Sequence, residues 1–135
     1  MITLKEIKKE YMNKGCITHA LNGINLHVDE GELLAIVGTS GSGKSTLLNI
    51  IGGMDRASSG EYYFKNDLIS SYNNKEIQRF RREYISFVFQ DFELLNEYTV
   101  YENIEMPLLA RNINKKERKN RINKALQILD IEKII

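Results

Sequence analysis

The chain has 135 residues and is 42% apolar, so it can fold around a core of its own as about one domain. Its 19 basic and 18 acidic residues leave a net charge of +1, which argues against the broad basic surface typical of nucleic-acid-binding proteins. A single cysteine, a polar N-terminus and apolar runs of about five residues, against the roughly 20 needed to cross a bilayer, favour a cytosolic protein without direct membrane insertion.

The first part of the chain carries strand and helix signals on either side of a glycine-rich turn. Residues 18–28 alternate loosely between apolar and polar positions and predict an edge strand. Residues 33–37, L-L-A-I-V, form an unbroken apolar run, which predicts a parallel strand buried on both faces. After the turn, residues 44–51 predict a short buried helix that ends at a pair of glycines.

The middle of the chain predicts a strand, a polar helix and a second buried strand. Aromatic residues 61–65 are typical of a strand, and residues 73–83 predict a helix with Ile77 and Phe80 directed inward. Residues 84–89, Y-I-S-F-V-F, predict a buried strand that ends at Gln90.

Two helices are expected in the last part of the chain. Residues 99–111 predict a helix that Pro107 should kink or break. Residues 114–131 predict a helix whose apolar stripe consists of Ile122, Ala125, Leu126 and Leu129.

Several reactive or charged side chains lack a pattern that indicates chemistry. Cys16, His19 and His27 have no partner at metal-ligand or catalytic spacing, so we expect them to be structural or surface residues. The arginines between positions 79 and 82 are typical of a solvated helix face, with ligand binding as the alternative.

A phosphate-binding loop is the strongest motif in the sequence. Residues 38–45, G-T-S-G-S-G-K-S, match G-x-x-x-x-G-K-[ST] between an expected strand and an expected helix. The glycines let backbone N–H groups approach a polyphosphate, and the helix presents its positive end. Lys44 adds a charge near the outer phosphates, Ser45 offers a hydroxyl to Mg²⁺, and Thr46 is the next hydroxyl within reach. The predicted nucleotide site comprises Gly38, Thr39, Ser40, Gly41, Ser42, Gly43, Lys44, Ser45 and Thr46.

Longer segments resemble the ABC ATPases of macrolide exporters, lipoprotein-releasing systems and antimicrobial-peptide resistance pumps. They are A-L-N-G-I-N-L-H-V-D-E-G-E-L-L-A-I-V-G, the loop with L-L-N-I-I-G-G-M-D behind it, S-G-E-Y, F-V-F-Q-D-F-E-L-L and T-V-Y-E-N-I-E-M-P-L-L. Together they cover nearly the whole chain.

The resemblance implies an α/β phosphate-loop NTPase fold of the ABC ATPase type, represented by its N-terminal part. That part comprises peripheral antiparallel strands, the phosphate-loop strand and helix, the glutamine-loop strand and the start of a helical subdomain. Residues 1–90 would be the ATP-binding core portion, and residues 91–135 would begin the helical subdomain.

The resemblance also implies roles for two residues outside the loop. Tyr11 matches the aromatic residue that stacks on adenine, with an ordinary strand tyrosine as the alternative. Gln90 matches the glutamine that meets Mg²⁺ and the attacking water, with a plain strand-terminal glutamine as the alternative. With Lys44 and Gln90 in catalytic roles, the implied activity is ATP hydrolysis coupled to a transmembrane permease, in a dimer with a second ATP-binding subunit at the inner membrane face.

The sequence departs from that family beyond these motifs. It contains no L-S-G-G-Q segment, no apolar strand ending in D-E and no switch histidine, so we expect a truncated chain that binds ATP but hydrolyses it poorly. A non-hydrolysing nucleotide-binding fragment or regulatory remnant is therefore the alternative function. A phosphate-loop kinase for a small molecule is a third hypothesis, for which only the arginines near position 80 speak.

Overall fold

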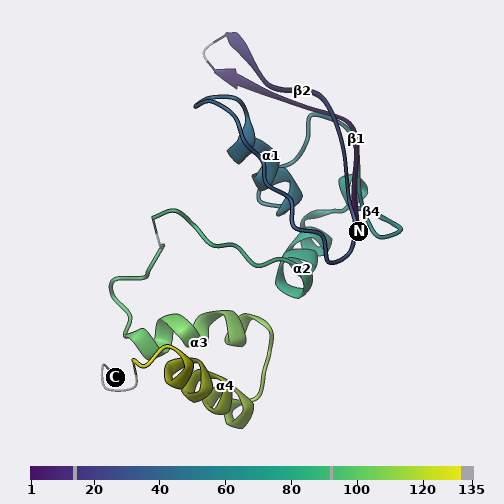
Figure 1. The fold of residues 1–135 in the computed structure, drawn as a ribbon. Helices are drawn as coiled ribbons and strands as arrows, with labels where there is room; N and C mark the ends of the chain where they lie inside the picture. The colour runs from purple at the N-terminus through teal and green to yellow at the C-terminus, as the bar shows by residue number, and fades with distance from the viewer. Residues whose placement is uncertain (14, 92, 132–135) are drawn as a thin grey trace. The chain divides into compact units, whose positions relative to one another are not determined.

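The computed structural model describes residues 1–13, 15–91 and 93–131 and shows an α/β protein (Figure 1). The chain divides into two compact units, Met1–Ser86 and Phe87–Ile135. None of the helices within the described ranges is long and apolar enough to span a bilayer. This division does not show what each unit does. The predicted start of a helical subdomain after residue 90 therefore stays a prediction.

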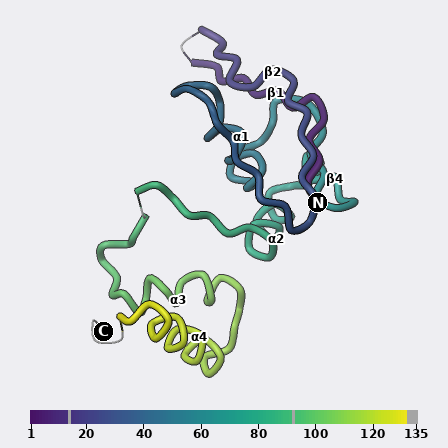
Figure 2. Tube along the Cα trace, in the orientation of Figure 1, coloured from purple at the N-terminus to yellow at the C-terminus, as the bar shows by residue number. Residues whose placement is uncertain are grey.

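The first unit is built on an antiparallel sheet of four strands in the order β2-β1-β3-β4. The strands are β1 (Ile2–Asn13), β2 (Cys16–Val28), β3 (Ser59–Phe64) and β4 (Asp67–Leu68). The long strands β1 and β2 form a hairpin that curves beside α1, as the trace in Figure 2 shows. The predicted edge strand is thus confirmed as β2, and the predicted aromatic strand is confirmed as β3.

A bulge in β1 interrupts the regular alternation of side chains along the strand and lets two core residues point inward. Leu4 and Ile7, exposed by 1% and 0%, lie three positions apart, whereas a regular strand turns every second residue to the same face. The pairing register shifts between them, and Glu6 has a φ of 50°. Opposite the bulge, a Cβ on Gly60 would lie 2.4 Å from the Glu6 carbonyl oxygen, so this close approach requires glycine.

Two α-helices and a short 3-10 helix complete the first unit. They are α1 (Lys44–Ile51), α2 (Asn74–Tyr84) and η1 (Ile69–Ser71). The predicted helices over residues 44–51 and 73–83 are confirmed, and Asn73 begins α2 with a capping box in which Glu76 takes part. The buried core combines side chains from the sheet and from all three helices: Leu4, Ile7, Leu21, Leu47, Ile50, Tyr62, Ile69 and Phe80.

The second unit contains the helices α3 (Val100–Ala110) and α4 (Lys115–Ile128). α3 continues through Pro107 to its end at Ala110, so the predicted helix is confirmed and the predicted break is wrong, whereas the predicted kink stays a prediction. Proline removes one helical hydrogen bond here without ending the helix. In α4, Ile122 and Leu126 are buried as predicted, whereas Leu129 lies just beyond the last turn and is 62% exposed.

The two predicted buried strands, at residues 33–37 and 84–89, are wrong in this structure. Residues 32–39 and 85–89 have no regular secondary structure, and Tyr84 still belongs to α2. Leu33 is 97% exposed and Val88 is 96% exposed. A parallel strand requires hydrogen-bonded neighbours and cover on both faces, and no strand of the described residues pairs with either segment.

Candidate functional site

The predicted phosphate loop leads directly into the first turn of α1. Gly43 is the residue before the helix, with a φ of 89°, and it has no side chain that could bond to the first helical N–H groups. These N–H groups therefore stay available to another acceptor, and the positive end of the helix dipole lies at the same place. The geometry suits a bound anion such as a phosphate group.

The loop rests against the edge strand β2. A Cβ on Gly43 would lie 2.5 Å from the Ala20 carbonyl oxygen and 2.9 Å from a methyl carbon of Leu21. The backbone of the loop is thus in direct contact with the strand behind it. This contact holds the loop against the sheet and requires glycine at position 43.

The Lys44 ammonium group is held inside the loop by oxygen atoms of the loop itself. Its Nζ donates hydrogen bonds to the carbonyl oxygens of Gly38 at 2.9 Å and Thr39 at 2.6 Å, and to Ser42 Oγ at 3.3 Å. A full positive charge therefore lies beside the backbone amides of the loop. A polyphosphate is the kind of ligand that uses both features.

Two hydroxyl residues follow Lys44 in the first turn of α1. Ser45 is exposed and Thr46 is half-buried. Within the described part of the chain, no group of three or more His, Cys, Asp or Glu side chains is arranged to hold a metal ion. The donor set fits Mg²⁺ held largely by nucleotide phosphates and water, with a serine hydroxyl as the protein ligand.

Tyr11 lies in the same unit as the loop and close to its helix. Its hydroxyl donates a 2.7 Å hydrogen bond to Asp55 Oδ2, and the side chain of Lys9 lies over its ring with Nζ 4.8 Å from the centroid. The hydrogen bond to Asp55 raises the pKa of the Tyr11 hydroxyl and burial adds to the rise, while a side-chain hydrogen bond with Thr46 opposes it. Tyr11 is thus linked to α1 through Asp55, whose backbone N–H donates to the Asn49 carbonyl oxygen.

Lys9 and Asp55 are not among the predicted site residues. They lie 46 positions apart and form an ion pair with Nζ 2.6 Å from Asp55 Oδ1. Asp55 ends the segment L-L-N-I-I-G-G-M-D, but Lys9 lies outside every segment that carries the resemblance, so no spacing in the sequence indicates the pair. Only the packing of β1 against the segment after α1 brings them together.

Gln90 belongs to the second unit and is exposed. Tyr11 and residues 38–46 lie in the first unit, and their predicted roles, like that of Gln90 at Mg²⁺ and water, stay predictions. The arginines of α2 include Arg79, which pairs with Glu83 at 2.8 Å on an exposed surface. This pairing agrees with the expected solvated helix face.

The cysteine and histidines lie on the surface, as expected. Cys16 is exposed. His19 lies 3.1 Å from a carboxylate oxygen of Glu10, and His27 contacts Thr3 Oγ1 at 2.9 Å. These contacts do not form a catalytic or metal-binding arrangement.

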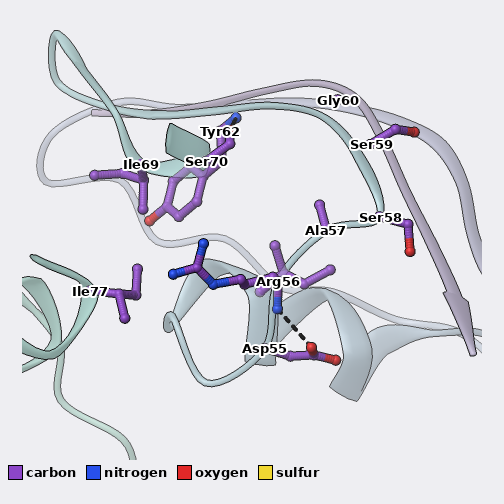
Figure 3. A pocket seen from close by; sticks show the side chains of 11 residues that line it. Asp55, Arg56, Ala57, Ser58, Ser59, Gly60, Tyr62, Ile69, Ser70 and Ile77 are labelled. Atoms are coloured by element: carbon purple, nitrogen blue, oxygen red, sulfur yellow. Dashed lines mark hydrogen bonds between the residues drawn. The ribbon is translucent and has the colours of Figure 1, made fainter. Parts of the chain in front are cut away.

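A cavity of about 230 Å³ lies between β3, η1 and α2, as Figure 3 shows. At its edge the backbone N–H of Arg56 donates a 2.7 Å hydrogen bond to Asp55 Oδ1. The cavity is lined by Ile50, Asp55, Arg56, Ala57, Ser58, Ser59, Gly60, Tyr62, Ile69, Ser70 and Ile77. None of the predicted site residues contributes to it, so the cavity is separate from the phosphate loop.

Comparison with known proteins gives one consistent family. The family model described as ABC transporter matches residues 21–135. The ABC transporter ATP-binding protein YknY of Bacillus subtilis is 42% identical over 127 residues, which cover 94% of this chain and 55% of the relative. The macrolide export ATP-binding/permease protein MacB of Haemophilus ducreyi is 41% identical over 133 residues, which cover 98% of this chain and 19% of the relative.

Solved structures show the same fold. The dimeric ATP-binding cassette MJ0796 in a post-hydrolysis state bound to ADP and Pi matches with a TM-score of 0.89 and 38% identity, over 99% of this chain and 60% of that chain. CbiO1 of Clostridium perfringens, part of the ABC transporter complex cbiONQ, matches with a TM-score of 0.76 and 33% identity, over 98% and 51%. The chain spans about half the length of curated relatives such as YknY and MJ0796.

Proposed function

The chain belongs to the ABC transporter family, and on that basis we propose that it binds Mg-ATP as an ATP-binding subunit that couples nucleotide binding and hydrolysis to a membrane permease. The single observation that carries the proposal is the phosphate loop. Open helical N–H groups, the Lys44 ammonium and a close-packed glycine turn lie together at the start of α1. This combination suits a nucleoside triphosphate.

Each residue of the proposed site has a separate task. The backbone amides of residues 38–46 bind the phosphates, and Lys44 offsets the charge of the outer ones. Ser45 and Gln90 hold Mg²⁺, which when bound supplies charge stabilisation for phosphoryl transfer. Gln90 also orients the attacking water, and the Tyr11 ring stacks on adenine.

The proposed partners follow from what the relatives are. MacB proteins are ATP-binding/permease proteins, and the MJ0796 cassette is dimeric. We therefore propose that this chain works with a second ATP-binding subunit and with a transmembrane permease, at the cytoplasmic face of the cell membrane. For the 135 residues alone we propose nucleotide binding with little turnover, since the sequence carries no signature segment and no continuous apolar strand that ends in D-E.

The test is titration of the chain with Mg-ATP, with phosphate release followed in the same samples. Lys44→Ala should weaken binding by roughly 10- to 150-fold, because a hydrogen bond to a charged group contributes about 1.5–3 kcal/mol. Lys75→Ala, on the exposed surface of α2, is the matched control and should bind like the parent chain. A folded chain that does not bind Mg-ATP would contradict the site, and steady phosphate release would contradict the proposed lack of turnover.

A further inference from the structure

We propose that Asp55 and Lys9 are positioning residues that hold the Tyr11 ring as a platform for the adenine base, and so set the preference of the site for ATP over bare polyphosphate. The inference rests on the proposed function, because it deepens the role of Tyr11 in the same nucleotide site. It concerns two residues that lie outside the phosphate loop and that are not among the predicted site residues.

Tyr11 is held at its hydroxyl and on one face of its ring. The hydroxyl donates to Asp55 Oδ2 at 2.7 Å, and Lys9 Nζ lies 4.8 Å from the ring centroid. The side chain still exposes 40% of its surface. A ring that is anchored at its end and covered by a cation on one face has its other face left for stacking.

The carboxylate of Asp55 accepts three hydrogen bonds from the protein. Oδ1 accepts from Lys9 Nζ at 2.6 Å and from the Arg56 backbone N–H at 2.7 Å, and Oδ2 accepts from Tyr11. Burial alone would raise the pKa of Asp55, but these hydrogen bonds outweigh it and the pKa is lowered. Asp55 therefore stays charged at neutral pH and is occupied in orienting its neighbours rather than in binding a ligand.

Lys9 is also fixed more firmly than an ordinary surface lysine. Its side chain is only 12% exposed, and Nζ makes a second hydrogen bond, to the Arg56 carbonyl oxygen at 2.7 Å. Lys5 on the same strand offers a contrast. It lies over the Tyr63 ring at 5.0 Å, but it is 59% exposed and its carboxylate partner is 4.0 Å away.

The network is tied to the helix that carries the phosphate loop. The backbone N–H of Asp55 donates to the Asn49 carbonyl oxygen of α1 at 3.1 Å, and the carboxylate of the same residue accepts from the Tyr11 hydroxyl. The ring is therefore connected to the same helix whose N-terminus would face the phosphates of a bound nucleotide. Such a link fixes the distance between a base-stacking surface and a phosphate site, which reduces the ordering cost of binding.

The experiment compares Mg-ATP with inorganic triphosphate as ligands of the full chain, in the parent and in Lys9→Met, Asp55→Asn and Tyr11→Phe. ATP affinity should fall roughly 5- to 10-fold in each variant, the size of one lost hydrogen bond, while triphosphate affinity should not change. Tyr11→Phe keeps the ring and removes only its hydroxyl. Because Tyr11 and Asp55 share one contact, Tyr11→Phe combined with Asp55→Asn should lose less than the product of the two single losses.

Lys5→Met is the matched control, since it removes a lysine over a tyrosine ring on the same strand and should change neither affinity. Equal losses of ATP and triphosphate affinity would assign the network to general stability and overturn the inference. Variants that keep the parent preference for ATP would overturn it while leaving the proposed function intact. A parent chain that binds triphosphate with the same affinity as ATP would contradict the platform role of Tyr11. A parent chain that binds neither ligand would contradict nucleotide binding altogether.

Discussion

Gly43 shows how one residue joins the phosphate loop to the sheet. Both Gly43 and Gly41 have positive φ angles, 89° and 79°, but only at Gly43 would a Cβ meet other atoms, the nearest at 2.5 Å. Gly41→Ala should therefore cost about 1–2 kcal/mol of unfolding free energy from its backbone conformation. Gly43→Ala should cost a further 1–3 kcal/mol or so, because the Ala20 carbonyl cannot move without disturbing β2.

Urea unfolding of the two alanine variants separates these contributions, provided that the m-value stays that of the parent. The shift in midpoint should be clearly larger for Gly43→Ala. Equal shifts would mean that the loop relaxes away from β2 without cost, and the contact would then not hold the loop in place.

Asp55 should make the stability of the first unit depend on acid pH. Its pKa is lowered in the folded chain, so its contribution is fully present above the unfolded value of about 3.9 and is lost as the pH falls through the folded value. Asp55→Asn removes this contribution at all pH values. The difference in thermal midpoint between parent and variant should therefore be largest near pH 7 and should shrink below about pH 4. A difference of the same size at pH 7 and pH 3 would contradict a stabilising role of the charged Asp55 carboxylate.

Arg118 joins the two helices of the second unit. Its Nε donates to Glu105 of α3 at 2.8 Å, and its guanidinium also donates to the Ile113 carbonyl oxygen at 2.7 Å. The side chains of Arg118 and Glu105 are only 17% and 20% exposed, so removing the arginine leaves a half-buried carboxylate and a carbonyl without their partner. Arg118→Met should cost about 1–3 kcal/mol of unfolding free energy.

Arg121 supplies the matched control for this prediction. It pairs with Glu117 at 2.7 Å along the same helix, but the two side chains are 54% and 44% exposed. Arg121→Met should cost at most about 0.5 kcal/mol, as exposed pairs four residues apart do. Chemical denaturation followed by helical circular dichroism measures both, and similar costs would mean that burial of the Arg118 pair has no effect.

Elements whose signals are local could be predicted from the sequence, and elements that depend on distant partners could not. Helix α2 could be predicted because its apolar positions, Ile77 and Phe80, lie within one segment. Strand β1 was not predicted, because its lysines and glutamates hide the pattern and the bulge at Glu6 spaces Leu4 and Ile7 irregularly. The phosphate loop was found for the same local reason, whereas the pair of Lys9 and Asp55 depends on tertiary packing.

The apolar segments at residues 33–37 and 85–89 show the limit of local patterns. Both are apolar enough to be buried strands, and the sequence alone cannot tell whether neighbouring strands cover them. In the structure they are largely uncovered, with Leu33, Val37 and Val88 exposed by 97%, 87% and 96%. Exposed unpaired backbone next to apolar side chains favours association with other chains.

The 135-residue chain should therefore self-associate as its concentration rises, through these uncovered segments. Replacing Leu33 and Val37 together with serine should weaken association by at least about tenfold, because burying each such side chain contributes about 1.5–3 kcal/mol. Met12→Ser is the control, since Met12 is 81% exposed but lies near the turn between β1 and β2 and belongs to neither segment. Sedimentation velocity over a range of concentrations measures the effect: a parent chain that stays monomeric, or a double serine variant that associates as before, would mean that the exposed apolar residues do not drive association.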